Sequence, residues 1–199
     1  MDSAIQRLII ELYDVGIIKF GKFTLKSGKQ SYIYADVRTA ISHPQIFRQI
    51  CDLFYSLIKD LQFSHICGVP YSALTFASGV AYAHHIPMLL KRKEMKAYGT
   101  KKILEGEYKD GDICLLIEDV ITSGSSLLET IAVLKEHGLV IKDICTLIDR
   151  NQGGGSEALN KLGYNVYSIM NLHDVINTLY NAGKISLADK ELSEQLESV

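Results

Sequence analysis

The sequence predicts an α/β fold in which helices flank both faces of a mainly parallel β-sheet. From His65 onward, short apolar runs alternate with stretches of helical periodicity, as they do when crossover helices join parallel strands. The chain has 199 residues, of which 47% are hydrophobic, a length and composition that suit one hydrophobic core. It contains no internal repeat, low-complexity tract or linker, so we expect a single domain over residues 1–199.

The N-terminal region, up to about residue 40, is expected to form a small hood beside this sheet. Apolar residues at positions 5, 8, 9 and 12 share one helical face and predict a helix that begins after Asp2 or Ser3 and ends at Gly16. Residues 20–38 are rich in aromatic and β-branched side chains and are interrupted by glycines, which favours short strands. A second helix is predicted with Ser42 as its N-cap and Pro44 in its first turn, followed by an apolar face up to residue 58.

The rest of the chain follows the alternation of strand and helix. We expect strands at 66–69, 88–90, 113–117, 144–148 and 166–169, and helices at 72–84, 125–137 and 157–162. An acidic stretch from Ser186, with Asp189 at capping-box spacing, predicts a solvated C-terminal helix. Because open parallel sheets bind ligands beyond the carboxyl ends of their strands, we expect the chemistry in the loops that follow the strands.

Residues 114–129 form the most informative segment of the chain. A buried strand is predicted to end at Glu118 and Asp119, and the small residues 122–126 then lead into an amphipathic helix. Hydroxyl side chains, backbone amides and the positive end of a helix dipole together favour a bound phosphate. The two acids suit ribose hydroxyls or a divalent cation. The plain alternative is a capped helix with two solvated acids, and a Walker A pattern is absent.

A second glycine-rich segment, residues 153–158, matches the pattern G-x-G-x-x-A of dinucleotide sites. In such sites the first glycine follows a strand directly, whereas four residues, 149–152, intervene here. We therefore interpret this segment as a turn before a helix.

The charge pattern excludes proteins that coat nucleic acid or an anionic membrane, because the net charge is only −2 and the pI is about 6.3. The charge is uneven, however. Residues 91–102 contain six basic side chains and one acid, a local charge of +5 that leaves −7 for the rest of the chain. This segment is either a solvated surface loop or the place where an anionic ligand is bound.

Other classes are excluded by the cysteines and the apolar segments. The four cysteines are far apart and lack metal-ligand spacing, so we expect buried, reduced thiols in a cytoplasmic protein. Charged residues interrupt any signal peptide at the N-terminus. The uncharged stretch 61–90 is broken by glycines, prolines and histidines, and therefore predicts a buried strand and helix, not a membrane span.

Five segments together resemble orotate phosphoribosyltransferase, a type I phosphoribosyltransferase. The acidic pair with residues 122–126 is similar to the family's motif for phosphoribosyl diphosphate (PRPP). The other four segments, in the family's order, are residues 23–28 (FTLKSG), 66–74 (ICGVPYSAL), 91–100 (KRKEMKAYGT) and 147–154 (LIDRNQGG). The likeness covers about residues 12–179 and is closest to the N-terminal domain of eukaryotic UMP synthase. It implies the type I phosphoribosyltransferase fold, with the hood formed largely by residues 1–40.

The resemblance implies a set of site residues. The PRPP contacts that it implies are Lys26, Tyr71, Ser72, Arg92, Lys93, Lys96, Tyr98, Glu118, Asp119, Val120, Ile121, Thr122, Ser123, Gly124, Ser125 and Ser126. The orotate contacts that it implies are Tyr34, Ala35, Thr122 and Arg150, and the catalytic residues are Lys93, Lys96 and Asp119.

Chemistry agrees with two of the orotate contacts. The ring of Tyr34 suits a flat pyrimidine, and the guanidinium of Arg150 suits a carboxylate, although a core tyrosine and a surface ion pair are the plain alternatives. The chain departs from many family members at Ser72, where Lys is common, and at Ala97, where Asp is common.

The activity implied is the Mg²⁺-dependent transfer of a phosphoribosyl group from PRPP to orotate, which gives orotidine 5′-monophosphate and pyrophosphate in UMP synthesis. The protein is not expected to ligate Mg²⁺ directly, because the ion is held mainly through substrate and water. The resemblance also implies a cytoplasmic homodimer that shares Lys26 and the loop from Arg92 to Tyr98 across subunits, without nucleic-acid or membrane partners. Because the chain stops where a decarboxylase domain would begin, we expect one activity.

Two other functions stay open. A phosphoribosyltransferase for a purine or for uracil would share the phosphate loop but not the segments 23–28 and 91–96. A regulator that senses PRPP would be expected to carry a DNA-binding extension or a basic face, and neither is evident in the sequence.

Overall fold

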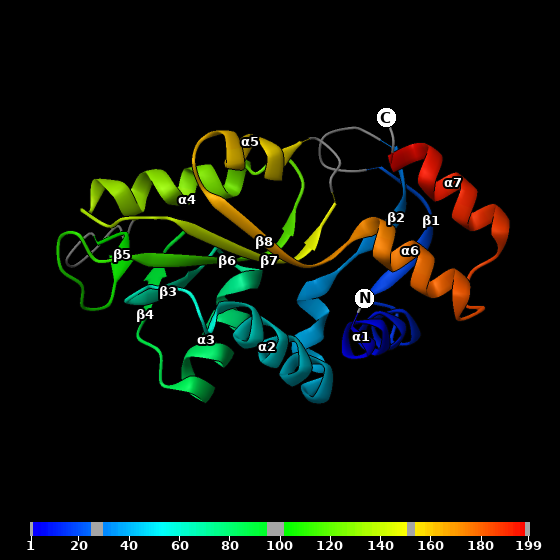
Figure 1. Ribbon diagram of the computed structural model, residues 1–199, viewed down its shortest axis with the longest axis horizontal. Helices are drawn as coiled ribbons and strands as arrows, with labels where there is room; N and C mark the ends of the chain where they lie inside the picture. The colour runs from blue at the N-terminus through cyan, green and yellow to red at the C-terminus, as the bar shows by residue number, and fades with distance from the viewer. Residues whose placement is uncertain (1, 25–29, 95–101, 151–153, 198–199) are drawn as a thin grey trace.

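A six-stranded, mainly parallel sheet forms the centre of the molecule (Figure 1). The computed structural model describes residues 2–24, 30–94, 102–150 and 154–197. The strands of the central sheet, in spatial order, are β5 (Leu104–Glu105), β4 (Met88–Lys91), β3 (His65–Gly68), β6 (Cys114–Ile121), β7 (Asp143–Asp149) and β8 (Asn165–Asn171). All neighbouring pairs are parallel except β4 and β5. The predicted fold class is therefore confirmed.

Helices cover both faces of this sheet, which explains why its central strands are almost wholly buried. Figure 1 shows α2 (Pro44–Ile58) and α3 (Ser72–His84) on one face, and α4 (Ser125–Glu136) and α5 (Gly155–Lys161) on the other. Every residue of β3 and β7 is buried, as are the first five residues of β6.

The strand order changes direction between β3 and β6. From β3 the chain continues outward to β4, whereas from β6 it continues in the opposite direction to β7 and β8. The helices that follow β3 and β6 therefore lie on opposite faces, and a crevice is expected between the carboxyl ends of these two strands.

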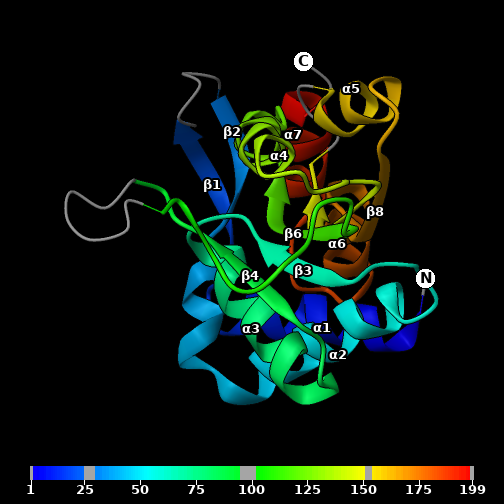
Figure 2. The ribbon, with the colours of Figure 1, turned by 90° about the vertical axis from the view of Figure 1, so that its left-hand side faces the viewer.

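The N-terminal helix and a hairpin form the predicted hood. The helix, α1 (Ser3–Asp14), is capped by Asp2, whose carboxylate accepts from the amide of Ala4 at 2.9 Å, and Gly16 follows with a φ of 74°. The antiparallel strands β1 (Ile18–Thr24) and β2 (Gln30–Ala35) come next. Figure 2 shows this pair to one side of the central sheet.

The C-terminal helices close the other side of the hood. α6 (Leu172–Asn181) begins with a capping box between Asn171 and Asp174. α7 (Leu187–Glu197) was predicted as a solvated helix; the helix and its reciprocal bonds between Ser186 and Asp189 are confirmed. The solvation is only partial, because α7 lies against β2 and the hydroxyl of Tyr32 donates to Asp189 at 3.1 Å.

Three local predictions differ from the structure. Ser42 is not the N-cap of α2, because a 3-10 helix, η1 (Val37–Ser42), includes it, and His43 precedes Pro44 at the first position of α2. Strand β6 continues past the acidic pair to Ile121, because β7 runs alongside it and supplies backbone partners. The two residues of β5 were not predicted, since so short a strand has no periodicity.

The expectations about membrane spans and about the cysteines can be compared with the described residues. None of the helices in this part of the chain is long and apolar enough to cross a membrane. Cys51, Cys67, Cys114 and Cys145 are all free and buried, as predicted. Burial raises the pKa of the Cys51 thiol to about 12, so this group stays protonated.

Candidate active site

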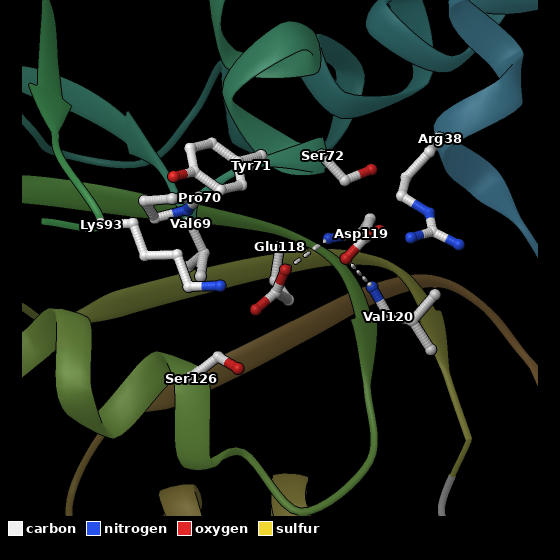
Figure 3. Close-up of a pocket in the computed structure, with 10 residues that line it drawn as sticks. All are labelled: Arg38, Val69, Pro70, Tyr71, Ser72, Lys93, Glu118, Asp119, Val120 and Ser126. Atoms are coloured by element: carbon white, nitrogen blue, oxygen red, sulfur yellow. Dashed lines mark hydrogen bonds between the residues drawn. The ribbon is translucent and has the colours of Figure 1, made fainter. Parts of the chain in front are cut away.

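A cavity of about 270 Å³ lies in the crevice between β3 and β6 (Figure 3). Its walls come from the hood, from the segments after β3 and β4, from the end of β6 and from the first turn of α4. The lining residues are Arg38, Val69, Pro70, Tyr71, Ser72, Lys93, Glu118, Asp119, Val120 and Ser126. Because β3, β4 and β6 are parallel, their carboxyl ends bring these distant segments to one edge of the sheet.

Two adjacent carboxylates form the floor of this cavity. The amide of Asp119 donates to Glu118 Oε1 at 3.0 Å, and the amide of Val120 donates to Asp119 Oδ1 at 2.9 Å, so short backbone bonds fix both side chains. Glu118 is only 7% exposed. Its burial, and then its contact with Asp119, raise the pKa of Glu118 well above the ordinary value. Glu118 therefore holds its proton to a higher pH than a solvated glutamate, and its carboxyl can donate a hydrogen bond to a ligand oxygen.

The loop of small residues that the sequence predicts to bind a phosphate follows the acids. Gly124 is the N-cap of α4, with a φ of 75°, and it has no side chain that could cap the helix. The amides of the first turn of α4 are therefore available to an anion at the positive end of the helix dipole. Two hydroxyls flank this turn, with Ser123 Oγ and Ser125 Oγ 3.2 Å apart, and Ser126 lines the cavity.

The loop is supported from behind by the start of α5. The amide of Gly155 donates to the carbonyl oxygen of Thr122 at 3.1 Å. A Cβ atom at Gly155 would overlap that oxygen and would lie 2.8 Å from the carbonyl carbon of Ser123. Gly155 therefore does more than form the predicted turn, because its lack of a side chain lets α5 approach the loop.

The segment after β3 forms the opposite wall. Gly68 ends β3, and a Cβ there would overlap the carbonyl oxygen of Ala73, so the absence of a side chain allows α3 to begin immediately. The Oγ atom of Ser72 is buried and lacks a hydrogen-bond partner among the described residues. Tyr71 is 64% exposed, and the ammonium of Lys93 lies 5.5 Å from the centre of its ring.

The described part of the basic segment, residues 91–94 and 102, adjoins a stem formed by β4 and β5. Arg92 pairs with Glu105, with Nη2 and Oε1 3.0 Å apart, and its amide donates to the carbonyl of Ile103 at 2.8 Å. Lys93 is exposed and lines the cavity, whereas Arg92 is held toward the second strand of the stem.

The hood adds aromatic and basic side chains. The rings of Phe23 and Tyr34 lie 5.3 Å apart, centre to centre. Arg38 donates from Nη2 to the hydroxyl of Tyr34 at 3.3 Å. Arg150, at the end of β7, is only 7% exposed, and its Nη2 donates to Ser31 Oγ in β2 at 2.8 Å. The hood is thus joined to the carboxyl edge of the central sheet by a buried guanidinium.

The structure brings together many of the predicted site residues. Those that line the single cavity of Figure 3 are Tyr71, Ser72, Lys93, Glu118, Asp119, Val120 and Ser126. Ile121 is different, since it is 1% exposed and belongs to the hydrophobic core. Lys26, Lys96 and Tyr98 lie outside the described residues.

Sequence reasoning missed three residues of the cavity lining, Val69, Pro70 and Arg38, and only Arg38 among them is charged. It follows the strand that carries Tyr34 and Ala35, and it forms the pattern Asp-x-Arg with Asp36. That pattern was the available signal, but it is common on protein surfaces and does not by itself indicate a site.

The donor set fits a Mg²⁺ ion only in combination with substrate. Within the described ranges, no group of three or more His, Cys, Asp or Glu side chains is placed to hold a metal. Glu118 and Asp119 offer carboxylate oxygens beside a cavity that has room for phosphates. Mg²⁺ is commonly bound in this way, through one or two carboxylates, water and substrate oxygens.

Comparisons with known proteins agree with this geometry. The family model for the phosphoribosyl transferase domain matches residues 38–175. The chain is 43% identical to uridine 5′-monophosphate synthase of Bos taurus over 93% of its own length and 39% of that protein. It is 35% identical to orotate phosphoribosyltransferase of Chlamydia pneumoniae, over 94% of this chain and 90% of the relative.

A solved structure gives the same result. Orotate phosphoribosyltransferase from Aeropyrum pernix superposes with a TM-score of 0.76 and 28% identity, over 90% of this chain and 99% of that one. The chain spans about two fifths of the length of the uridine 5′-monophosphate synthases that it matches.

Proposed function

This chain belongs to the orotate phosphoribosyltransferases of the phosphoribosyltransferase family, and we propose that it transfers the phosphoribosyl group of PRPP to orotate. The products are orotidine 5′-monophosphate and pyrophosphate, and the reaction is a step of UMP synthesis. The observation that carries the proposal is the cavity in which an acidic pair, a helix N-terminus and a lysine converge. These groups suit a ribose, a 5′-phosphate and a pyrophosphate, in that order.

The phosphoribosyl end of PRPP is assigned to β6 and α4. Glu118 and Asp119 bind the ribose hydroxyls, and their fixed orientation limits the motion of the sugar. Residues 122–126 bind the 5′-phosphate through backbone amides and hydroxyls. Val120 and Ile121 form the end of β6 and position this loop. Ile121 is buried in the core and therefore acts by anchoring the strand end.

The pyrophosphate is assigned to the opposite wall. Tyr71 and Ser72 precede and begin α3, and Lys93 faces them from the end of β4. Lys96, Tyr98 and Lys26 are proposed to add to this charge, as the family resemblance implies, and Arg92 joins them if it leaves Glu105. Bound Mg²⁺ would supply positive charge to the departing pyrophosphate. The reaction passes through a cation-like state at the ribose anomeric carbon, so the residues act by orienting the substrates and stabilising charge.

The orotate ring is assigned to the space between the hood and the loop. Tyr34 offers an aromatic face, Ala35 is small enough to allow close approach, and Thr122 offers a hydroxyl. Arg150 is the fourth proposed contact of the orotate ring system. Its bond to Ser31 keeps the guanidinium in place beneath the hood.

A cytoplasmic homodimer is part of the same proposal. The four free cysteines fit a reducing compartment. In the dimer, Lys26 and the loop from Arg92 to Tyr98 are shared between the sites of the two subunits.

An assay with three bases tests the proposal. Purified protein is mixed with PRPP, Mg²⁺ and orotate, uracil or hypoxanthine in turn, and loss of the free base and release of pyrophosphate are followed. We expect turnover with orotate that requires both PRPP and Mg²⁺. Turnover restricted to uracil or hypoxanthine would reassign the base, and binding of PRPP without turnover of any base would indicate a regulator.

A matched variant shows that the signal comes from this site. Asp119→Asn keeps the size of the side chain and removes its charge, and we expect it to lower turnover with orotate by about 10²-fold or more. Asp110→Asn, an exposed aspartate that does not line the cavity, is the control and should keep full activity.

A further inference from the structure

Arg38 lies at the hood end of the cavity, across from Lys93. Figure 3 shows the two cationic side chains on opposite sides, with Glu118 and Asp119 between them. The backbone of Arg38 is anchored to the core, because it belongs to η1, in which Val37 and Ala40 are buried at 1% and 0% exposure. The Arg38 side chain, in contrast, is 65% exposed.

Two neighbours orient the guanidinium of Arg38. Its Nε donates to Asp36 Oδ1 at 2.7 Å, and its Nη2 donates to the hydroxyl of Tyr34 at 3.3 Å. A guanidinium has five N–H donors, so these two bonds leave three donors for a ligand. Residues that are already held by hydrogen bonds lose less conformational entropy when a ligand binds.

Arg38 differs in this respect from Arg150. Arg150 is 7% exposed and donates to Ser31, so it offers a ligand less guanidinium surface than Arg38 does. Arg38 is open to the cavity and is bonded to Tyr34, the residue assigned to the face of the base. It is therefore the more accessible of the two guanidinium groups beside the proposed base site.

The positions of the two cations indicate which anion Arg38 binds. Lys93 lies beside Tyr71, at the end of the cavity assigned to pyrophosphate. Arg38 lies at the other end, beside Tyr34. In orotate the carboxylate is attached to the ring carbon next to the nitrogen that reacts, so it must lie close to the junction of base and ribose. The planar guanidinium matches the geometry of a carboxylate and can bind both of its oxygens.

We propose that Arg38 binds the carboxylate of orotate and thereby selects orotate over pyrimidines that lack this group. The inference rests on the proposed function and adds to it a residue that determines substrate specificity. Asp36 is a positioning residue in this arrangement. It accepts a hydrogen bond from Nε of Arg38 and orients the guanidinium, and as an anion it does not bind the carboxylate itself. Uracil, which is orotate without the carboxylate, would gain no binding affinity from Arg38.

Arg38→Ala, Arg38→Lys and wild type are compared in orotate binding, PRPP binding and turnover. We expect Arg38→Ala to weaken orotate binding by about 10- to 100-fold, the loss typical of a charge-assisted hydrogen bond, and to leave PRPP and pyrophosphate binding within about twofold. Arg38→Lys should restore only part of the loss, because an ammonium cannot form the bidentate contact. Uracil, measured as a competitive inhibitor against orotate, should bind the Ala variant as it binds wild type.

The control is Arg48→Ala, which removes an exposed arginine of α2 that is 85% exposed and does not line the cavity. It should leave every constant unchanged. If Arg38→Ala weakens pyrophosphate binding and spares orotate, the anion is pyrophosphate and the inference is wrong. It is also wrong if uracil and orotate weaken equally, or if neither changes. Failure of wild type to use orotate would instead overturn the proposed function.

Discussion

Gly155 supports the loop of residues 122–126 from a position 33 residues after Thr122 in the chain. Its amide donates to the carbonyl of Thr122 at 3.1 Å, and there is no space for a Cβ atom between the two segments. Leu159 of the same helix lies against Gly124, since a Cβ at Gly124 would be 3.3 Å from its Cδ1. The shape of the loop therefore depends on the packing of α5 as well as on the sequence of the loop.

Replacing Gly155 with Ala should displace the loop. The methyl group must push α5 or the backbone of residues 122–124 aside, so we expect the affinity for ribose 5-phosphate to fall by about tenfold or more, with pyrophosphate binding retained. Calorimetric titration with each ligand gives the comparison. Gly163→Ala is the matched control, because Gly163 has a φ of 90° but no atom within 4 Å of a Cβ, so it adds backbone strain without touching the loop. Equal losses in both variants would mean that general destabilisation is the cause.

Glu118→Gln should stabilise the fold at neutral pH while it lowers activity. Burial raises the pKa of Glu118, so the wild-type protein is most stable when Glu118 is protonated. This stability is lost as the pH rises through the folded-state pKa of Glu118. The neutral amide avoids that loss. Urea unfolding at several pH values should show a more stable variant at pH 7 and no difference below pH 4.5, the ordinary glutamate value.

Glu157→Gln provides the comparison for this experiment. Glu157 is exposed, and its pair with Lys161 lowers the pKa of its carboxyl, which is the opposite direction. Its replacement should therefore give no stabilisation at neutral pH. A Glu118→Gln variant that is less stable than wild type at pH 7 would show that the hydrogen bonds of the carboxylate outweigh its burial.

Lys96→Ala should reduce turnover by about 10²- to 10³-fold, because the proposal gives this cation a contact that strengthens as charge develops on the leaving pyrophosphate. Folding and ribose 5-phosphate binding should persist. Steady-state kinetics measure kcat and KM for PRPP separately, and Lys102→Ala, an exposed lysine outside the cavity lining, is the control. Turnover near that of wild type would remove Lys96 from the mechanism.

Arg150→Ala should chiefly weaken orotate binding, by about tenfold or more, and spare PRPP. Because Arg150 is buried and bonded to Ser31, the variant is also expected to be less stable, so binding must be measured on protein whose folded fraction is known from circular dichroism. Ser31→Ala serves as the companion variant, since it keeps the guanidinium and removes only its support. Unchanged orotate affinity in folded Arg150→Ala would exclude Arg150 from the base site.

Much of the fold could be predicted because its signals are local. Helical spacing located α1, α2 and α3, and the apolar runs located five of the six strands of the central sheet. The arrangement of acids, small-residue loop and helix start could be predicted for the same reason, since all three lie within a dozen residues. Ser42 was placed wrongly because η1 extends to it, an outcome that depends on Val37 and Ala40 packing into the core.

The fold class, the loop of small residues before α4 and the separation of a basic segment from an otherwise acidic chain all follow from the sequence alone. Each of these features depends on residues that are close together in the chain, so hydrophobic periodicity or residue type is enough to predict it. The folded structure is needed to see that Arg38 lines the same cavity as Glu118 and that Gly155 supports the loop. Both results depend on distances between segments that are far apart in sequence, which close packing sets and composition does not.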